Sequence, residues 1–306
     1  MRAVYYQAFG GPENLQLGER PDPVLAAGQL LVRTHAAGVG IWDVKLMGRD
    51  GGPAPWPRIP GCEVAGTVEV AAAGFSAGDR IFSSLFSAGG GGFAEIAAVR
   101  VDKAAVIPDS LGFPEAAGLV IPGITAYEGL VDRARLRAGE TVLVTAASGG
   151  VGTAAVQIAR NLGARVVAVA SARHHDYVRD LGAELAVDYH DSGFAGQLRS
   201  AVPDGFDALF DGTGNEVRDQ AIGLIRDGGR GIFIVGGPPP ARAGAELQYF
   251  GANTTTQRLE AIAQLASDGK LRMPIEAELP LDQAREAMEH VGAGHTAGRV
   301  VLRVGS

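Results

Sequence analysis

Cysteine is almost absent from this chain. Cys62 is the only cysteine among 306 residues, so no disulfide can close within one chain and no four-cysteine zinc site can be built. A reducing compartment is the natural setting for such a sequence. We therefore expect a cytoplasmic location.

Long apolar runs and an excess of positive charge are also missing. No segment reaches the ~18 apolar residues needed to span a bilayer, and the N-terminus lacks the charged-then-apolar pattern of a signal peptide. The formal net charge of -7 disfavours binding to nucleic acid or to anionic membranes. Hydrophobic residues make up 46% of the chain, which permits a sizeable core and argues against disorder. The sequence thus predicts a globular protein with neither nucleic acid nor membrane as partner.

Glycine, in contrast, is abundant, with 45 residues, and together with proline it divides the first third of the chain. Short β-prone runs lie between these breaks, at residues 30–34, 63–70, 79–82 and 93–101. Short strands separated by such turns are typical of a barrel-like or sandwich domain. The length of the chain suggests a second domain after it.

From residue 141 onward, strands and helices alternate. The apolar pattern predicts strands at 141–145, 165–170, 185–189, 208–211 and 231–235, with helices at 151–162 and 176–181 between them. This alternation predicts an α/β domain with a doubly wound parallel sheet. The last part breaks the rhythm, with helices predicted at 257–270 and 281–290 and a strand at 298–304, so we expect the chain to return to the first domain.

The most informative segment is Thr141-Val-Leu-Val-Thr-Ala-Ala-Ser-Gly-Gly-Val-Gly152. Ala147, Gly149 and Gly152 occupy the three positions of a dinucleotide fingerprint, with alanine at the first. Small residues are needed there because the backbone must turn tightly and approach a pyrophosphate, which then meets the unpaired N–H groups of a helix start. A turn that serves only packing is the alternative; the strand before it and the helix after it favour nucleotide binding.

The end of the second predicted strand indicates which cofactor binds. An acidic residue there would bind the adenosine ribose and favour NAD, but this chain has Ala170-Ser-Ala-Arg-His-His175. Ser171 can donate a hydrogen bond to a 2′-phosphate, and Arg173 can pair with its charge. NADPH is therefore the predicted cofactor, although Arg173 could instead be a solvated residue at a helix start.

Several motifs together resemble the medium-chain dehydrogenase/reductase superfamily, and within it the quinone oxidoreductase branch. They are Ala146-Ala-Ser-Gly-Gly-Val-Gly152, His35-Ala-Ala-Gly-Val39, Pro60-Gly-Cys-Glu-Val-Ala-Gly66, Gly123-Ile-Thr-Ala-Tyr127 and Gly298-Arg-Val-Val-Leu302. The resemblance implies a GroES-like β-rich domain formed by both chain ends, residues 1–120 and 266–306. Between them it implies a Rossmann NADPH-binding domain with a doubly wound parallel sheet, residues 121–265. It also implies a homodimer.

The resemblance further implies roles for individual residues. Thr125 would hold the nicotinamide carboxamide, and Ser148, Gly149, Gly150 and Val151 would cradle the pyrophosphate. Ser171, Arg173 and Tyr189 would bind the 2′-phosphate end, with Gly212 and Thr213 near the adenosine or its ribose. Val235, Gly236 and Gly237 would border the nicotinamide, and Arg299 would reach the phosphates.

The positions that hold catalytic zinc in the alcohol dehydrogenases of this superfamily are altered. Those enzymes carry a cysteine after Gly-Val and a histidine in Gly-His-Glu, and the matching positions here are Gly40 and Cys62. Glu63 alone does not make a metal site, so a three-ligand zinc centre is not expected. The quinone reductases typically have Asn-Pro after Gly-Val, whereas this chain has Gly40-Ile41-Trp42.

These features predict a zinc-free, NADPH-dependent reductase that transfers a hydride to a small molecule, a quinone or an activated alkene. Asp43, Lys45 and Tyr127 are candidate proton donors, and Trp42, Phe86 and Tyr249 are candidate walls of the substrate pocket, although core packing explains the aromatic residues equally well. Two alternatives stay open. One is a dedicated tailoring reductase of a polyketide-like aromatic, and the other is a non-catalytic NADPH-binding sensor or structural protein.

Overall fold

Two compact units make up the chain. The computed structural model describes residues 1–48, 56–72, 74–294 and 296–305. Unit 1 comprises Met1–Ile121 and Thr254–Ser306, and unit 2 comprises Pro122–Asn253. The chain thus leaves unit 1, builds unit 2 and returns.

The point of return differs from the boundary proposed from the sequence. The resemblance implies that the middle domain ends at residue 265, but helix α7 (Thr256–Ser267) belongs to unit 1. The hydroxyl of Thr256 donates to the carbonyl of Val101, and the Lys103 ammonium donates to the carbonyl of Thr254. These bonds attach the first turn of α7 to the N-terminal part of unit 1.

Unit 2 is a six-stranded sheet in the order β10-β9-β8-β11-β12-β13, and every neighbouring pair is parallel. Its strands are β8 (Thr141–Val144), β9 (Arg165–Val169), β10 (Leu185–Val187), β11 (Phe206–Asp211), β12 (Ile225–Phe233) and β13 (Glu246–Tyr249). Helices α3 (Gly150–Asn161), α4 (His175–Leu181), α5 (Phe194–Ala201) and α6 (Glu216–Ile222) connect them. This strand order confirms the predicted doubly wound α/β sheet.

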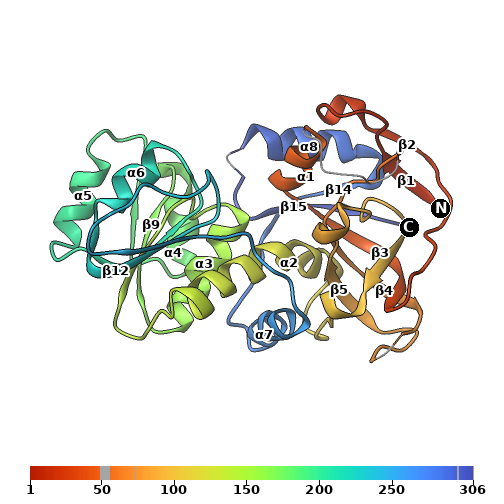
Figure 1. Cartoon of the computed structure of the whole chain (residues 1–306), viewed down its shortest axis with the longest axis horizontal. Helices are drawn as coiled ribbons and strands as arrows, with labels where there is room; N and C mark the ends of the chain where they lie inside the picture. Colours follow the sequence, from red (N-terminus) through yellow and green to blue (C-terminus); the bar gives the residue numbers. More distant parts are fainter. Residues whose placement is uncertain (49–55, 73, 295, 306) are drawn as a thin grey trace. The chain divides into compact units, whose positions relative to one another are not determined.

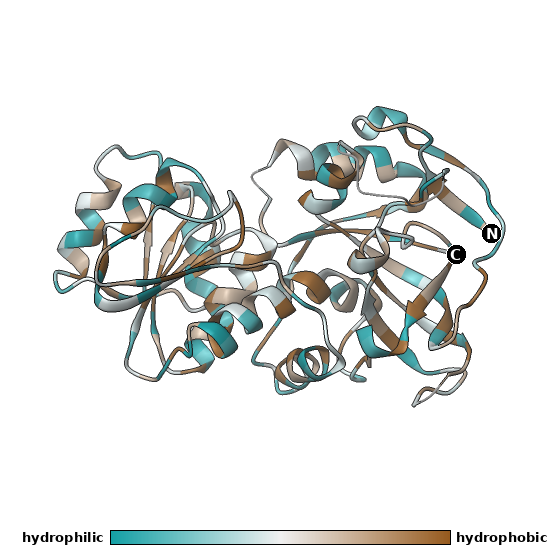
Figure 2. Ribbon diagram, viewed as in Figure 1, coloured by the Kyte–Doolittle hydropathy of each residue, from teal (hydrophilic) through white to brown (hydrophobic). Residues whose placement is uncertain are grey.

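The core of unit 2 is formed by the strands and the helix faces that cover them. Leu143, Val167 and Phe206 are fully or almost fully buried in one hydrophobic cluster with Leu198 of α5. Figure 2 shows the inner strands of this sheet in hydrophobic colours, while the surrounding helices carry hydrophilic residues on their outer faces. Strands buried on both faces read as nearly continuous apolar runs, which is why the sequence predicted them.

Unit 1 is built around a seven-stranded sheet in the order β14-β15-β3-β4-β5-β7, with β6 also paired to β3. Its strands are β3 (Gln29–Val39), β4 (Glu63–Val70), β5 (Arg80–Ser84), β6 (Ile96–Arg100), β7 (Ala104–Val106), β14 (Ile275–Pro280) and β15 (Arg299–Arg303). A separate antiparallel pair comprises β1 (Arg2–Tyr5) and β2 (Gln16–Glu19), and unit 1 also contains helices α1 (Ile41–Met47), α7 and α8 (Ala284–Ala293) (Figure 1). Antiparallel pairing of β15 with β3 joins the two ends of the chain in one β-rich domain.

One continuous helical segment carries the chain from unit 1 into unit 2. Helix α2 (Phe113–Tyr127) is followed directly by the π-helical segment η4 (Glu128–Arg133). Unit 1 ends at Ile121 and unit 2 begins at Pro122, which lies inside α2. Proline lacks an N–H, so the helical hydrogen bond to Gly118 is absent where the units divide.

Among the described residues, no helix has the length and apolar character needed to cross a membrane.

Candidate functional site

The turn after β8 in unit 2 has the geometry that the fingerprint predicts. A Cβ at Gly152 would lie 2.2 Å from the carbonyl oxygen of Ala146, so only glycine fits. Ala146 itself has a positive φ of 49°, which marks the sharp bend of the backbone. Helix α3 begins at Gly150, and its first amides have no partner within the helix. Gly149 donates its amide to the carbonyl of Ala146, whereas the amides of Gly150 and Val151, both partly exposed, lie at the positive end of the α3 dipole and can bind an anion.

A buried carboxylate connects this turn to the next loop. Asp211, at the end of β11, accepts hydrogen bonds from the Thr145 hydroxyl at 2.5 Å and from the Thr213 hydroxyl at 2.6 Å. Its other oxygen accepts from the Gly214 amide at 3.1 Å, and the Gly212 amide donates to Thr145 Oγ1. Asp211 thus fixes the loop that contains the predicted residues Gly212 and Thr213. Neither Asp211 nor Thr145 was predicted as a site residue, although both are polar and stand at the ends of the predicted strands 208–211 and 141–145.

The third loop at the same edge of the sheet follows β12 and contains the predicted residues 235–237. Gly236 has a φ of 77°, and a Cβ there would lie 2.7 Å from the carbonyl oxygen of Gly214. The Ile234 amide donates to the carbonyl of Asp211. The loops after β8, β11 and β12 therefore contact one another at the carboxyl ends of adjacent parallel strands, where ligands of doubly wound sheets bind.

The loop after β9 brings the residues predicted for a 2′-phosphate close to the end of β10. Ser171 is buried and Arg173 is exposed, and the Ala170 amide donates to the carbonyl of Val187. Tyr189 follows that strand and packs its ring against His190, with centroids 4.1 Å apart. Asp188 also lies here, and hydrogen bonds from the His190 amide, the His190 ring and the Ala172 amide lower the pKa of its carboxyl, so it is ionised at neutral pH.

Thr125 and Tyr127 lie in the part of α2 that belongs to unit 2. Thr125 is buried and Tyr127 is partly buried. Two residues further on, Gly129 lies against the sheet, because a Cβ there would be 2.5 Å from the ring of Phe210. The helix therefore approaches β11 closely, which fixes where Thr125 and Tyr127 stand in unit 2.

In unit 1, Asp43 holds the loop between β3 and α1. Its Oδ2 accepts from the Gly40 amide at 2.8 Å, and its Oδ1 accepts from the Cys62 amide at 3.0 Å. The side chain is fully buried, which raises the pKa of its carboxyl, although these two amides and the charge of Arg299 oppose the shift. With both oxygens engaged, Asp43 is suited to fixing the loop and poorly placed to deliver a proton.

A second buried carboxylate lies beside it. Glu63, at the start of β4, accepts from the Ile121 amide at 2.8 Å and pairs with the Arg299 guanidinium of β15. Burial raises the pKa of Glu63 to about 8, against the attraction of Arg299. Arg299 also stacks over the ring of Trp42, with its guanidinium carbon 5.0 Å from the ring centroid. Arg299 is thus buried in unit 1 and paired with a carboxylate, a contact that its predicted phosphate-binding role did not anticipate.

Trp42 shapes the loop at residues 40–42, where the sequence lacks the Asn-Pro that the resemblance implies. A Cβ on Gly40 would lie 2.1 Å from the Trp42 ring, so the indole fills the space that a side chain at position 40 would need. The indole N–H of Trp42 is buried and has no hydrogen-bond partner among the described residues. The remaining candidates are exposed: Lys45 and Phe86 in unit 1, and Tyr249 at the end of β13 in unit 2.

A doubly wound sheet with a side-chain-poor turn at its carboxyl edge, joined to a β-rich domain made of both chain ends, defines an NAD(P)-binding oxidoreductase. Residues 26–109 match the family described as alcohol dehydrogenase GroES-like domain, and residues 181–302 match the family described as zinc-binding dehydrogenase. The chain belongs to the medium-chain dehydrogenase/reductase superfamily, in its quinone oxidoreductase branch.

Individual relatives agree with this assignment. The chain is 33% identical to the quinone oxidoreductase of Mus musculus, over 99% of this chain and 98% of that protein. It is 30% identical to the chloroplastic NADPH-dependent alkenal/one oxidoreductase of Arabidopsis thaliana, over 99% and 79%. Among solved structures, an NAD-dependent alcohol dehydrogenase has a TM-score of 0.91 at 28% identity, covering 100% of each chain. A mycobacterial protein complexed with NADPH has a TM-score of 0.87 at 28% identity, covering 99% of each chain.

Proposed function

We propose that this oxidoreductase transfers a hydride from NADPH to a quinone or an α,β-unsaturated carbonyl compound without the help of zinc. The observation that carries the proposal is the turn at residues 146–152, where the carbonyl of Ala146 leaves room only for glycine at position 152. The names of the quinone and alkenal/one oxidoreductases that resemble the chain support the substrate class.

The residues of unit 2 fit a phosphorylated dinucleotide. The amides of Gly150 and Val151 would bind the pyrophosphate, and Ser171 with Arg173 would bind the 2′-phosphate. Thr125 and the loop at 235–237 would border the nicotinamide, and Gly212 and Thr213 the adenosine ribose. Bound NADPH would supply the hydride, and the protein would contribute position and exclusion of water.

The residues at the zinc positions of the superfamily do not fit a metal. Gly40 has no side chain, and burial raises the pKa of the Cys62 thiol, with the neighbouring Asp43 acting in the same direction. Glu63 is already engaged by Arg299 and the Ile121 amide. Within the described residues no group of three or more His, Cys, Asp or Glu side chains could hold a metal. We therefore propose hydride transfer to acceptors that need no Lewis acid.

A reduced acceptor requires a proton after the hydride has been added. Lys45 is exposed and Tyr127 is partly buried, so either can exchange protons with solvent, and both remain our candidates. Trp42, Phe86 and Tyr249 remain our candidates for the pocket walls. A homodimer also remains a prediction, which light scattering of the purified protein would test.

The direct test is to mix the purified protein with NADPH and follow the absorbance of the reduced nicotinamide after adding phenanthrenequinone or an enone. We expect oxidation of NADPH that depends on the acceptor and persists in the presence of a metal chelator. Tight NADPH binding without oxidation by any acceptor would favour a non-catalytic binding protein. Turnover confined to one bulky aromatic acceptor would favour a dedicated tailoring reductase.

Cofactor preference has its own test in Arg173→Gln. We expect this change to weaken NADPH binding about tenfold, because it removes a charge-assisted hydrogen bond to the 2′-phosphate, and to leave NADH binding unchanged. Calorimetric titration with both cofactors measures the ratio. Arg199→Gln, on the exposed side of α5, is the matched control. Equal losses for NADPH and NADH would show that Arg173 does not recognise the 2′-phosphate.

A further inference from the structure

A pocket of about 350 Å³ opens in unit 2 away from the dinucleotide turn. Its lining includes Glu140, directly before β8, together with Arg226 near the start of β12 and Glu246 at the start of β13. Because these strands are parallel, their amino ends share one edge of the sheet. The turn at residues 146–152 follows the carboxyl end of β8 and lies at the opposite edge. The pocket is therefore separate from the site proposed for the dinucleotide.

An irregularity in β12 shapes this pocket. Phe206 pairs with Ile225, but Ala208, two residues later, pairs with Arg230, so extra residues of β12 bulge out of the ladder. Gly228, inside the bulge, has a φ of 75°, and its amide donates to the carbonyl of Gly244. Such bulges redirect side chains and are frequent beside functional sites.

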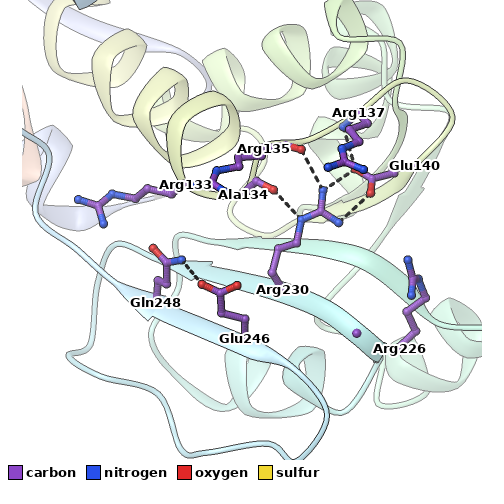
Figure 3. A pocket seen from close by; sticks show the side chains of 10 residues that line it. Arg133, Ala134, Arg135, Arg137, Glu140, Arg226, Arg230, Glu246 and Gln248 are labelled. Atoms are coloured by element: carbon purple, nitrogen blue, oxygen red, sulfur yellow. Dashed lines mark hydrogen bonds and ion pairs between the residues drawn. The ribbon is translucent and has the colours of Figure 1, made fainter.

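One ion pair, between Arg230 and Glu140, lines the pocket. Arg230 contacts both carboxylate oxygens of Glu140 and donates to the carbonyls of Ala134 and Arg135 (Figure 3). Burial opposes the shift, but the hydrogen bonds from Arg230 and the Arg137 amide lower the pKa of Glu140. This pair is internally neutral, and it holds the loop at residues 134–137 in place.

Other cations of the pocket keep free hydrogen-bond donors. Arg135 and Arg137 are exposed, and neither guanidinium has a hydrogen-bond or ion-pair partner among the described residues. Arg226 donates one bond to Asp207 and one to the carbonyl of Asp227, which leaves part of its guanidinium unused. Three guanidinium groups thus offer donors around one cavity in a chain whose net charge is -7.

Another part of the pocket lining carries a negative charge, that of Glu246, and offers hydrogen-bond acceptors. In Figure 3, Glu246 and Gln248 lie on one side of Arg230, and Arg137 and Arg226 lie on the other. The Gln248 amide donates to one oxygen of Glu246 at 2.6 Å, and no cation pairs with this carboxylate among the described residues. A bare anion would be repelled by Glu246, so a ligand that satisfies both sides must carry an anionic group and hydroxyl donors.

We propose that this pocket binds a small organic phosphate, with its phosphate on Arg135, Arg137 and Arg226 and its hydroxyls on Glu246 and Gln248. Guanidinium groups match the geometry of phosphate oxygens, and a carboxylate accepts strongly from hydroxyls. The volume is within the range of small-ligand sites, about 300–1,000 Å³. This binding is independent of the dinucleotide site and does not rest on the proposed reductase activity.

Ribose 5-phosphate is the probe for a calorimetric titration of the full-length protein. We expect saturable binding that weakens at least about tenfold in Arg135→Gln/Arg137→Gln, since one lost charge-assisted hydrogen bond already corresponds to about that factor. Arg199→Gln removes an exposed arginine outside the pocket and should leave the affinity unchanged. Neither substituted guanidinium has a hydrogen-bond or ion-pair partner among the described residues, so thermal unfolding of the double variant should match that of the parent.

A second variant tests the two-sided recognition. Glu246→Gln should weaken ribose 5-phosphate and strengthen inorganic phosphate, because it removes a negative charge and a strong hydroxyl acceptor together. Free ribose should show no saturable binding. Absence of saturable ribose 5-phosphate binding to the parent protein would overturn the proposal, as would equal affinity in the double arginine variant. Parallel changes for both probes in Glu246→Gln would overturn the hydroxyl contact.

Discussion

At the scale of single residues, Gly40 and Trp42 depend on each other. The Trp42 indole occupies the space where a Cβ of residue 40 would lie, 2.1 Å from the ring. The Asn-Pro that the resemblance to quinone reductases implies would put a side chain at position 40, where this chain has glycine and the Trp42 ring lies. A side chain at position 40 therefore requires the Trp42 ring to shift.

Gly40→Ala should therefore destabilise the protein by about 1–3 kcal/mol, the usual cost of an added methyl group in filled space. Urea unfolding monitored by tryptophan fluorescence measures the change, and the emission of Trp42 should shift because its ring must move. Gly48→Ala, at the other end of α1, is the control, since the nearest atom to its new Cβ would be 3.9 Å away. Equal small effects of both variants would contradict the dependence of Gly40 on Trp42.

Single residues also differ in how far the sequence predicts them. Ala147, Gly149 and Gly152 were predictable because a tight turn at a helix start requires small residues at fixed spacing. The pairing of Glu63 with Arg299 was not, because the two residues are 236 positions apart and nothing local indicates the contact. Asp43 was predicted as a proton donor because it follows the altered loop at Gly40-Ile41-Trp42, whereas its backbone partners Gly40 and Cys62 become visible only in the fold.

At the scale of elements, the Glu63–Arg299 pair connects three segments, since Glu63 begins β4, Arg299 begins β15 and the Ile121 amide belongs to α2. Burial raises the pKa of the carboxyl from 4.5 to about 8. A carboxyl that binds its proton more tightly in the folded state favours folding below its unfolded pKa, and it loses that contribution as the pH rises through the folded pKa.

The stability of the parent relative to Glu63→Gln should consequently fall between pH 4.5 and about 8, with a slope of at most about 1.4 kcal/mol per pH unit. Urea unfolding of both proteins across this range gives the difference. Glu260→Gln, on the exposed side of α7, provides the same change of charge without burial. If the difference in the free energy of unfolding between the parent and Glu63→Gln stayed constant over this pH range, Glu63 would be ionised throughout it.

Elements were predictable where the hydrophobic pattern was strong. The run at 63–70 coincides with β4, in which five of the eight residues are buried. Residues 225–230 of β12 were missed, since Asp227-Gly228-Gly229 reads as a turn, and in the structure these residues form the bulge. Helix α2 contains Gly118, Pro122 and Gly123, which read as helix breakers, so neither its helical state nor its position at the division of the units could be predicted from propensity.

At the scale of the whole molecule, unit 2 has the parts of an independent domain. One hydrophobic cluster, which includes Leu143, Phe206 and Phe233, takes all of its buried residues from unit 2. A fragment of residues 122–253 should therefore fold by itself and unfold in urea in one cooperative transition. Phe206→Ala in the same fragment should lower its stability by about 3–5 kcal/mol, because a large buried ring is removed. A gradual loss of signal in the parent fragment would refute this independence.

The sheet of unit 1 cannot form completely until β15 has been synthesised, because this sheet contains strands from before and after unit 2. Residues 36–39 of β3 pair with β15, which follows the whole of unit 2 along the chain. Since protein synthesis runs from the N-terminus, unit 2 can fold while this part of β3 still has an unpaired edge. Exposed strand edges invite wrong pairing, so the interval between the synthesis of β3 and that of β15 is the stage at which the nascent chain is most exposed to aggregation.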